Sequence, residues 1–330
     1  MKKYVKLTSI ALITFLAIIL TACSATSFAA SNKTPDTPTT PTNKATVYMI
    51  TEISPDALIK IYKALGATPS GKIAIKIHTG ESEKSNYLRP TLVGKLIKSL
   101  KGTIVECNTA YGGNRTNAAA HLQLAEEHGF TSLAKVDIMD GEGDIAIPVN
   151  GGTHLKENFV GKSFPNYDYF VVLSHFKGHQ MGGFGGAIKN LSIGIASSRG
   201  KSWIHSAGTQ TEGINRETNQ DHFLESMAEA AKSVSDYVDG KILYINVMNR
   251  LSVDCDCNGD PAEPDMHDIG ILASFDPVAL DQACVDLVYA ASDSASLIER
   301  IESRNGIHTL EHAAKLGLGN REYKLVYLDK

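Results

Sequence analysis

Alternation of apolar strands with amphipathic helices is the feature that most constrains how this chain folds. The clearest strand is Tyr169–His175, YFVVLSH, which is apolar along almost its whole length. A strand that is apolar on both faces must be covered on both faces, as in a parallel sheet flanked by helices. Shorter strands and helices continue this alternation from residue 45 to residue 330, without an internal repeat. The pattern predicts an α/β fold with a largely parallel sheet, built as one unit or as two lobes.

Residue patterns and helix caps predict the bounds of these elements. Ser54-Pro55 starts a helix that ends at Gly66, and Asp276-Pro277 starts another that runs to Ala290. Further helices are expected at 91–100, 116–128 and 219–238. Strands are expected at 45–50, 72–77, 103–107, 136–140, 144–149, 169–175, 241–247 and 268–274.

The first residues indicate export rather than a part of the fold. Three lysines precede the apolar run 10–20, which is too short to span a bilayer as a mature helix, so residues 1–22 are predicted to be a signal peptide. The run ends in LTAC at 20–23, which resembles a bacterial lipobox. This resemblance implies cleavage before Cys23 and a diacylglycerol on its thiol. The alternative is cleavage near Ala29-Ala30, which would remove Cys23.

A polar segment then separates the lipid site from the folded part. Residues 24–44 contain three Pro and many Thr and Ser, with almost nothing to bury, so residues 23–44 are predicted to be a lipidated cysteine and a flexible tether. The body, 45–330, is therefore expected outside the cytoplasm, anchored to a membrane through Cys23.

Of 32 basic and 36 acidic residues, five basic and one acidic lie in 1–44, which leaves the body with a net charge of -8. An acidic body does not attract phosphate backbones, so nucleic acid is not an expected partner.

Four cysteines remain after Cys23, at positions 107, 255, 257 and 284. They form no CxxC pair and no cluster of four, so neither an iron–sulfur centre nor a structural zinc site is expected. Cys255-Asp256-Cys257 is compatible with a small strained disulfide or with two free thiols on a loop. Acidic residues and one histidine around this loop either hold a cation or form solvated turns: Asp254, Asp256, Asp260, Asp265, His267 and Asp268.

The glycine-rich stretch 174–208 carries most of the candidate chemistry. It follows the most apolar strand, and α/β proteins place their sites at the ends of such strands. Its glycines at 182, 183, 185 and 186 allow close approach of the backbone to a ligand. Neither GxxxxGK[ST] nor GxGxxG is present, so the glycines give little support for a nucleotide. Three histidines, His175, His179 and His205, are candidate metal ligands or, in the ordinary alternative, buried or exposed imidazoles.

Several phrases of this chain resemble those of one protein family. They are VECNTAYGGNR, VVLSHFKGHQMGGFGGAIKNLSIGIASSRGK, IHSAG, YINVMN, DCDC and DIGILASFDPVALDQACVDLV. Over about 45–330 the chain resembles domain-of-unknown-function family 362, whose members are often labelled iron–sulfur centre proteins. Many relatives carry a ferredoxin-like insertion with CxxCxxC clusters after the HS motif, whereas here His205-Ser206 leads through 209–220 directly into a helix. The resemblance therefore implies the family's fold without its iron–sulfur cluster.

A more distant resemblance is to the lactate racemase family. In that family a His is followed by a Lys ten residues later, across a GFGGGAK-type loop, and by another His sixteen residues further on. His179, Lys189 and His205 have these spacings, and Arg89-Pro90 is similar to that family's Arg-Pro element. The resemblance implies His179 as acid/base, Lys189 bonded to a nickel-pincer nucleotide and His205 on nickel. The family's second acid/base His is replaced here by Asn114, which cannot accept a proton at neutral pH, so two-base racemisation is not expected.

Two classes of function are compatible with these residues. The first is an exported enzyme for redox or proton-transfer chemistry that depends on a metal, nickel or another transition metal, or on a cofactor. The second is a lipid-tethered protein that binds a metal or a small anionic ligand. The residues that would carry the first function are His179 as acid/base, Lys189, Arg89, Gly183, Gly185 and Gly186 for the cofactor, and His205 and His175 for the metal.

Overall fold

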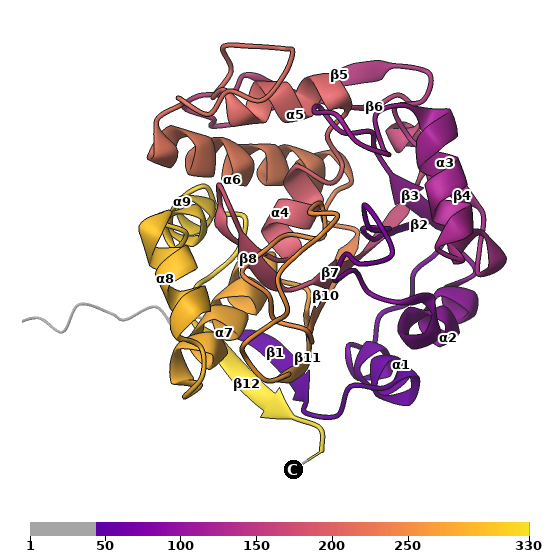
Figure 1. The fold of residues 1–330 in the computed structure, drawn as a ribbon, viewed down its shortest axis with the longest axis vertical. Helices are drawn as coiled ribbons and strands as arrows, with labels where there is room; N and C mark the ends of the chain where they lie inside the picture. Colours follow the sequence, from indigo (N-terminus) through magenta and orange to yellow (C-terminus); the bar gives the residue numbers. More distant parts are fainter. Residues whose placement is uncertain (1–43, 330) are drawn as a thin grey trace, which may run out of the picture. The chain divides into compact units, whose positions relative to one another are not determined.

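The computed structural model describes residues 44–329, which are built around one eight-stranded sheet (Figure 1). The strand order is β12-β1-β11-β10-β7-β2-β3-β4. Strand β11 is antiparallel to both neighbours, and all other neighbouring pairs are parallel. The largely parallel α/β sheet predicted from the sequence is thus confirmed. Its strands are β1 (Ala45–Ile50), β2 (Ile73–Lys76), β3 (Thr103–Glu106), β4 (Val136–Ile138), β7 (Tyr169–His175), β10 (Ile242–Met248), β11 (Gly270–Ser274) and β12 (Tyr323–Tyr327).

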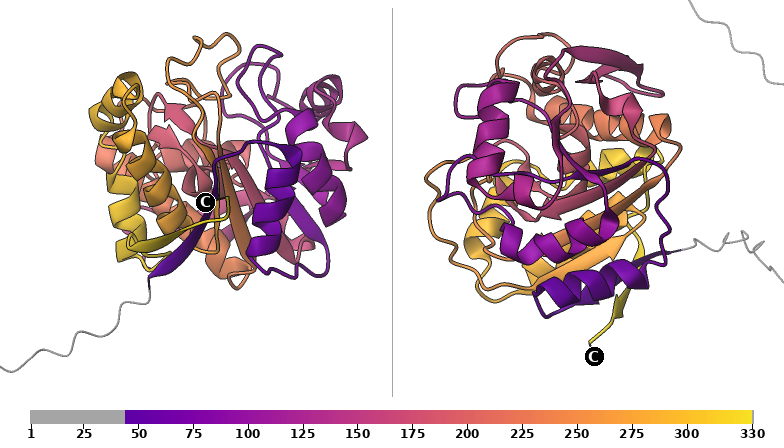
Figure 2. Two further views of the ribbon diagram at one scale, coloured as in Figure 1. Left: turned by 90° about the horizontal axis from the view of Figure 1, so that it is seen from below. Right: turned by 90° about the vertical axis from the view of Figure 1, so that its right-hand side faces the viewer.

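Helices cover both faces of the sheet (Figures 1 and 2). One face carries α1 (Pro55–Ala64), α2 (Pro90–Leu100) and α3 (Ala118–Glu127). The other carries α4 (Ala187–Ser192), α6 (Gln220–Tyr237), α7 (Pro277–Ala290), α8 (Ala295–Ser303) and α9 (His308–Lys315). Strand β7 shows why both layers are needed, because Val171 packs into one buried cluster and Val172 into the other.

Helix starts follow the caps that the sequence predicted. The Ser54 side chain accepts a hydrogen bond from the Ala57 amide at the start of α1, and Asp276 accepts from the Val278 and Ala279 amides at the start of α7. None of the helices within 44–329 combines the length and hydropathy needed to cross a bilayer. The signal peptide, Cys23 and residues 24–43 of the tether lie outside the described residues.

Smaller elements complete the described part of the chain, and most were not predicted. They are the two-stranded sheets of β5 (Asp144–Pro148) with β6 (Glu157–Gly161) and β8 (Lys177–His179) with β9 (Gly183–Gly185), helix α5 (Ser198–His205), and 3-10 turns at Phe130–Ser132 and Phe164–Asn166. The hairpin β8–β9 arises within the glycine-rich stretch. Its turn places Gly183 at φ +78°, in the left-handed region that glycine adopts without strain.

The order of the strands locates the functional edge of the sheet. From β2 the chain moves through β3 to β4 on one side, then returns to β7 on the other side of β2 and continues to β10. The carboxyl ends of strands at such a reversal leave a crevice where ligands bind in α/β proteins. Here those ends are Lys76, Glu106 and His175. In Figure 2 the connection 249–269 rises above this edge of the sheet.

Candidate functional site

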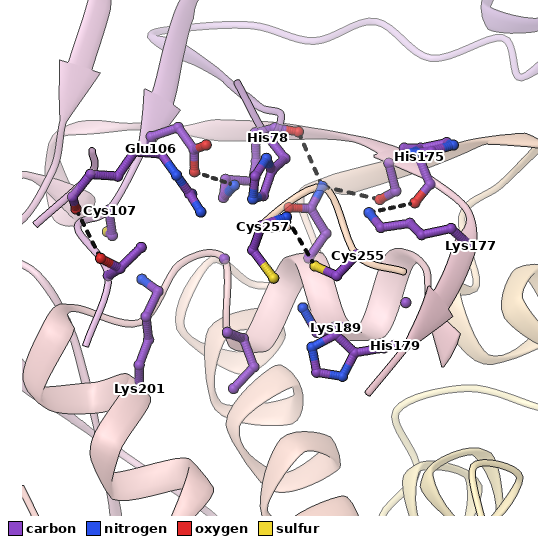
Figure 3. Close-up of a pocket in the computed structure, with 18 of the residues that line it drawn as sticks. His78, Glu106, Cys107, His175, Lys177, His179, Lys189, Lys201, Cys255 and Cys257 are labelled. Atoms are coloured by element: carbon purple, nitrogen blue, oxygen red, sulfur yellow. Dashed lines mark hydrogen bonds and ion pairs between the residues drawn. The ribbon is translucent and has the colours of Figure 1, made fainter. Parts of the chain in front are cut away.

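A cavity of about 90 Å³ lies at the carboxyl ends of β2, β3 and β7 (Figure 3). By volume it accommodates an ion and a small molecule rather than a nucleotide. Residues from separate segments of the chain line it: Lys76, His78, Glu106, Cys107, Thr109, Tyr111, Arg115, Ser174, His175, Lys177, His179, Gly185, Gly186, Lys189, Asn190, Ile193, Gly194, Lys201, His205, Ile214, Cys255 and Cys257.

Three potential metal ligands lie close together on the wall of this cavity. One ligand atom from each of His179, Cys255 and Cys257 lies within 4.8 Å of the other two. His179 ends β8, and both cysteines lie on the connection 249–269 between β10 and β11. Within residues 44–329, no other group of three or more His, Cys, Asp and Glu side chains brings one ligand atom of each this close together. Two thiols and an imidazole are the soft donors that transition metals prefer.

The two cysteines are free thiols, which decides between the alternatives that the sequence left open. The Cys257 amide donates to Cys255 Sγ at 3.4 Å. A separate hydrogen bond between the two side chains, from the Cys257 thiol to Cys255, holds the pKa of Cys255 well below its usual value, against the effect of burial, and Lys189 and His179 contribute in the same direction. The pKa of Cys257 is raised well above the usual value by that hydrogen bond and by burial. Cys255 is therefore the thiolate of the pair.

Hydrogen bonds fix the proton of His179 on one ring nitrogen. Its Nδ1 accepts from the amide of Gly182 at 2.9 Å and from that of Met181 at 3.3 Å. Since Nδ1 is an acceptor, the neutral ring carries its proton on Nε2. Burial, and then the charge of Lys189, lowers the pKa of His179 to about 4, so the ring is neutral at pH 7. A neutral imidazole with a proton on the remaining nitrogen is suited to proton transfer.

The other tautomer is found in His205, at the end of α5. Its Nδ1 lies 2.7 Å from the Lys201 carbonyl oxygen, which can only accept, so Nδ1 donates and Nε2 keeps its lone pair. Nε2 has no hydrogen-bond partner in the described part of the chain. Burial lowers the pKa of His205 to about 3, which keeps this lone pair available at neutral pH. Metal-bound histidines have this arrangement, with one nitrogen donating to a carbonyl and the other ligating.

Both ring nitrogens of His175 already have protein partners. Nδ1 lies 2.7 Å from the Asp256 carboxylate, and Nε2 lies 2.6 Å from the Asn249 carbonyl oxygen. Both partners are acceptors, so both ring nitrogens are engaged as donors. Asp256 also accepts from Lys177 Nζ at 2.8 Å. The metal role predicted for His175 stays a prediction, but this geometry leaves it no lone pair and makes it a support for the loop that carries the cysteines.

Buried ion pairs also hold charged side chains at the cavity. Lys76 Nζ lies 2.8 Å from Glu106 Oε2, and both side chains are almost fully buried. Arg115 Nε donates to Glu81 Oε2 at 2.8 Å. Burial alone would raise the pKa of Glu106, but Lys76 and the neighbouring cationic groups hold it well below the usual range. Glu106 is therefore a carboxylate at neutral pH.

Among the predicted cofactor residues, three lie at the cavity. Lys189 extends from α4 toward the cysteines, as Figure 3 shows, and has no hydrogen bond or ion pair among the described residues. Gly185 and Gly186 form the wall beside it. A Cβ at Gly186 would lie 2.3 Å from Asp281 Oδ1. The Asp281 carboxylate accepts from the Ala187 amide through Oδ1 and from the Ile188 amide through Oδ2. Gly186 thus lets Asp281 hold the start of α4 and so positions Lys189.

The structure places Arg89 and Gly183 away from the cavity lining. The Arg89 guanidinium donates to the carbonyls of Glu83 at 2.7 Å and Ser85 at 2.9 Å, and lies 4.0 Å from the centre of the Tyr87 ring. Gly183 packs in β9 against the backbone of Gly306. The cofactor roles predicted for Arg89 and Gly183 therefore stay predictions. In this structure both residues make contacts within the fold.

Most of the charged cavity wall was not identified from the sequence. The missed residues are Lys76, His78, Glu106, Cys107 and Arg115. The sequence marks these residues only weakly as site residues, since charged residues are common at the ends of strands. A Lys or Glu at the end of an otherwise apolar strand is the one pattern that indicates such a position. The acidic residues around the cysteines do not converge on a cation. Asp256 turns inward, whereas Asp260 pairs with Lys84 and His267 with Asp293.

Comparison with known proteins finds a family but no described function. The family model "Domain of unknown function (DUF362)" matches residues 73–286, a span that contains every residue lining the cavity. No curated protein matches the chain. Among solved structures, the chain is similar to the lactate racemase apoprotein from Thermoanaerobacterium thermosaccharolyticum, with 16% sequence identity and a TM-score of 0.42. That match covers 73% of this chain and 56% of the racemase chain, so it spans little more than half of that protein.

Proposed function

Since the chain belongs to the family described as Domain of unknown function (DUF362), as its motifs predicted, we propose a function from the cavity that this family region encloses. We propose that the protein is a transition-metal-dependent enzyme for redox or proton-transfer chemistry, held outside the cytoplasm by a lipid on Cys23. The observation that carries this proposal is the approach of the Cys255 and Cys257 sulfurs to each other and to the His179 imidazole in a small buried cavity.

The donor set fits a soft or borderline metal ion. The pKa of Cys255 is held well below its usual value, which favours the thiolate that a metal binds, and Cys257 would give up its proton to ligate a metal. The third ligand is an imidazole, and the tautomer of His205 suits it better than that of His179. His205 lies outside the group of atoms within 4.8 Å, so its ligation requires a local shift of α5. The bound ion would supply a redox centre or a Lewis acid.

The other side chains have separate roles in this proposal. His179 exchanges a proton through Nε2, because Nδ1 is held by two amides. Lys189 stabilises negative charge on the sulfurs and on whatever is bound beside them. The spacing of His179, Lys189 and His205, which resembles that of lactate racemases, makes nickel the first metal to test.

Metal analysis of the mature protein from its own membranes tests the proposal directly. We expect one transition-metal ion per chain, and we expect Co²⁺ to give sulfur-to-metal charge-transfer absorption when it replaces that ion. A Cys255→Ala/Cys257→Ala variant should lose both signals. Cys284→Ala is the matched control, because Cys284 is buried in the core and does not line the cavity. Protein that neither contains nor takes up a transition metal would overturn the proposal.

A binding protein for metal capture is the second candidate. It is favoured by the small volume, about 90 Å³, which leaves little room for a large substrate once an ion is bound. The two candidates differ in what His179 does. If the protein only captures metal, His179→Gln should leave metal affinity unchanged, and neither the variant nor the wild type should turn over a substrate. An enzyme predicts that the same variant keeps its metal but loses proton exchange with solvent at the substrate carbon.

A further inference from the structure

A second pocket, of about 280 Å³, lies outside the cavity, where the end of α8 meets the turn of the hairpin β8–β9 and the start of α6 (Figure 1). It shares no lining residue with the cavity. Three arginines and five uncharged residues line it: Arg216, Arg300, Arg304, Gln180, Met181, Thr218, Gln220 and Phe223. The body as a whole has a net charge of -8, yet this pocket is lined by three positive charges and no carboxylate.

The three guanidinium groups have no ion-pair partner within residues 44–329. Arg300 Nη1 donates to the Val253 carbonyl oxygen at 2.6 Å. The side chains of Arg216 and Arg304 form no hydrogen bond with this part of the chain. Arg304 directly follows α8, one turn after Arg300, so the two are neighbours along the helix. Arg216 reaches the same pocket from the loop before α6.

The acidic residues that adjoin these arginines in the sequence do not line the pocket. They are Glu217, Asp221, Glu299 and Glu302. Asp221 accepts a hydrogen bond from Asn305 Nδ2 at 2.7 Å, and Glu302 accepts one from the Tyr289 hydroxyl at 3.3 Å. Guanidinium groups that gather without a carboxylate repel one another, and an anion from outside the chain would remove this repulsion.

Contacts within the fold hold the backbone around this pocket. Gln220 Nε2 donates to the Met181 carbonyl at 2.7 Å and to the Arg304 carbonyl at 2.8 Å, which ties the hairpin turn and the end of α8 to the start of α6. A Cβ at Gly183 would lie 3.0 Å from Gly306 Cα, so glycine lets the hairpin lie against the chain that follows α8. The positions of the arginine backbones are therefore set before a ligand binds, which lowers the cost of binding.

The charge and the donors of the pocket indicate the class of anion. A guanidinium is a planar fork of N–H donors that matches two oxygens of a carboxylate or a phosphate. A flat monoanion presents two oxygens in one plane, whereas a phosphate presents oxygens in several directions and carries more charge. Three guanidinium groups from two segments of the chain therefore suit a phosphate dianion better. A volume of about 280 Å³ also leaves room for a small substituent beside Met181 and Phe223.

We propose that this pocket binds a phosphate group, which is carried by inorganic phosphate or by a small phosphate monoester. Arg300 and Arg304 would hold the phosphate from the end of α8, and Arg216 would hold it from the loop before α6. This site is additional to the metal site of the proposed function and does not depend on it.

Calorimetric titration of the mature protein at pH 8 tests this site, with inorganic phosphate, methyl phosphate and formate as probes. At this pH both phosphates are largely dianions, whereas formate is a flat monoanion. We expect saturable binding of one phosphate per chain, and binding of formate that is weaker by roughly tenfold or more. Arg304→Gln and Arg216→Gln should each weaken phosphate binding by roughly tenfold or more, since each removes a charged donor. Arg199→Gln is the matched control, because Arg199 pairs with Asp144 and does not line the pocket.

The two phosphates also identify the source of the ligand. Methyl phosphate that binds at least as tightly as inorganic phosphate would assign a phosphate monoester, and weaker binding would assign the free ion. No saturable binding of either phosphate, or formate binding as tight as that of phosphate, would overturn the inference. Unchanged affinity in both arginine variants would also overturn it, because the anion would then lie elsewhere, such as in the cavity. Metal content, measured on the same samples, tests the proposed function separately, since the two sites share no residue.

Discussion

Asp256→Asn is the most informative single perturbation of this structure. Asp256 lies between the two cysteines and is fully buried, with one oxygen 2.7 Å from His175 and the other 2.8 Å from Lys177. Asparagine keeps the volume but not the charge, so it leaves the buried ammonium of Lys177 without a counter-ion and the His175 ring without its carboxylate partner. Removing one partner from a buried ion pair costs about 3–5 kcal/mol of unfolding free energy. For a domain of this size, that lowers Tm by roughly 10 °C.

Thermal unfolding followed by circular dichroism at pH 7 measures this loss. Asp260→Asn is the control, because Asp260 pairs with Lys84 at the exposed surface, where such a pair contributes less than about 1 kcal/mol. Lys177→Met/Asp256→Asn should be more stable than the sum of its single variants predicts, since it removes one uncompensated charge. An Asp256→Asn protein within about 0.5 kcal/mol of wild type, or strict additivity in the double variant, would refute this account of the loop.

The same variant links stability to pH and to metal binding. Burial alone would raise the pKa of Asp256, but His175 and Lys177 hold it well below its usual value. The stability that this shift contributes is therefore present above the pKa of the unfolded chain, about 4, and is lost as the pH falls toward the folded value. Asp256→Asn should lack this acid-dependent part. Metal affinity should fall about 10–100-fold, as for other residues that support metal ligands.

Three further predictions concern separate parts of the chain. Cys23→Ala should release the protein from the membrane into the aqueous phase of a detergent partition, and continued retention would reject the lipid anchor. Lys189→Ala should weaken metal or ligand binding by about 2–5 kcal/mol in titrations while changing thermal stability by less than about 0.5 kcal/mol, and unchanged binding would make the glycine-rich loop a structural turn. His121, whose pKa burial lowers to about 3, binds a proton in the unfolded chain at higher pH than in the folded one. The stability that depends on a neutral His121 is therefore present above pH 6.5 and is lost as the pH falls toward 3. In His121→Phe the free energy of unfolding should fall less steeply over this range, by up to about 1.4 kcal/mol per pH unit. An unchanged slope would contradict this.

The sequence predicted the central sheet apart from its edge strand β12, because most of its strands are apolar on both faces. Strand β7 and helix α7 have the bounds that their apolar run and their Asp276-Pro277 start indicated. The hairpin β8–β9 and helix α5 were missed for a physical reason. The hairpin is made of glycine-rich sequence, and the α5 sequence, SRGKSWIH, has a low apolar content. Only the Ser197 cap of α5 could have signalled its start.

Part of the site was predictable and part was not. His179, Lys189 and His205 line one cavity, as their position after β7 predicted. The approach of Cys255 and Cys257 to His179 depends on a loop without periodic pattern, held in place by contacts with residues about 80 positions earlier in the chain. No local signal encodes such contacts. The tautomers that separate the roles of His179 and His205 likewise depend on backbone groups that only the folded chain brings near.

The antiparallel placement of β11 has an evolutionary consequence. Strands β10 and β11 are adjacent and run in opposite directions, so the connection between them needs no crossover. The length of this connection can therefore change without changing the pairing of the two strands. That connection carries the sulfur atoms and is fastened to the loop before α2 by hydrogen bonds such as Ser85 Oγ to the Asn258 carbonyl and Arg250 Nε to Asn86 Oδ1. Insertions and deletions between residues 249 and 269 could therefore exchange the reactive groups of the cavity while the folding scaffold is inherited unchanged.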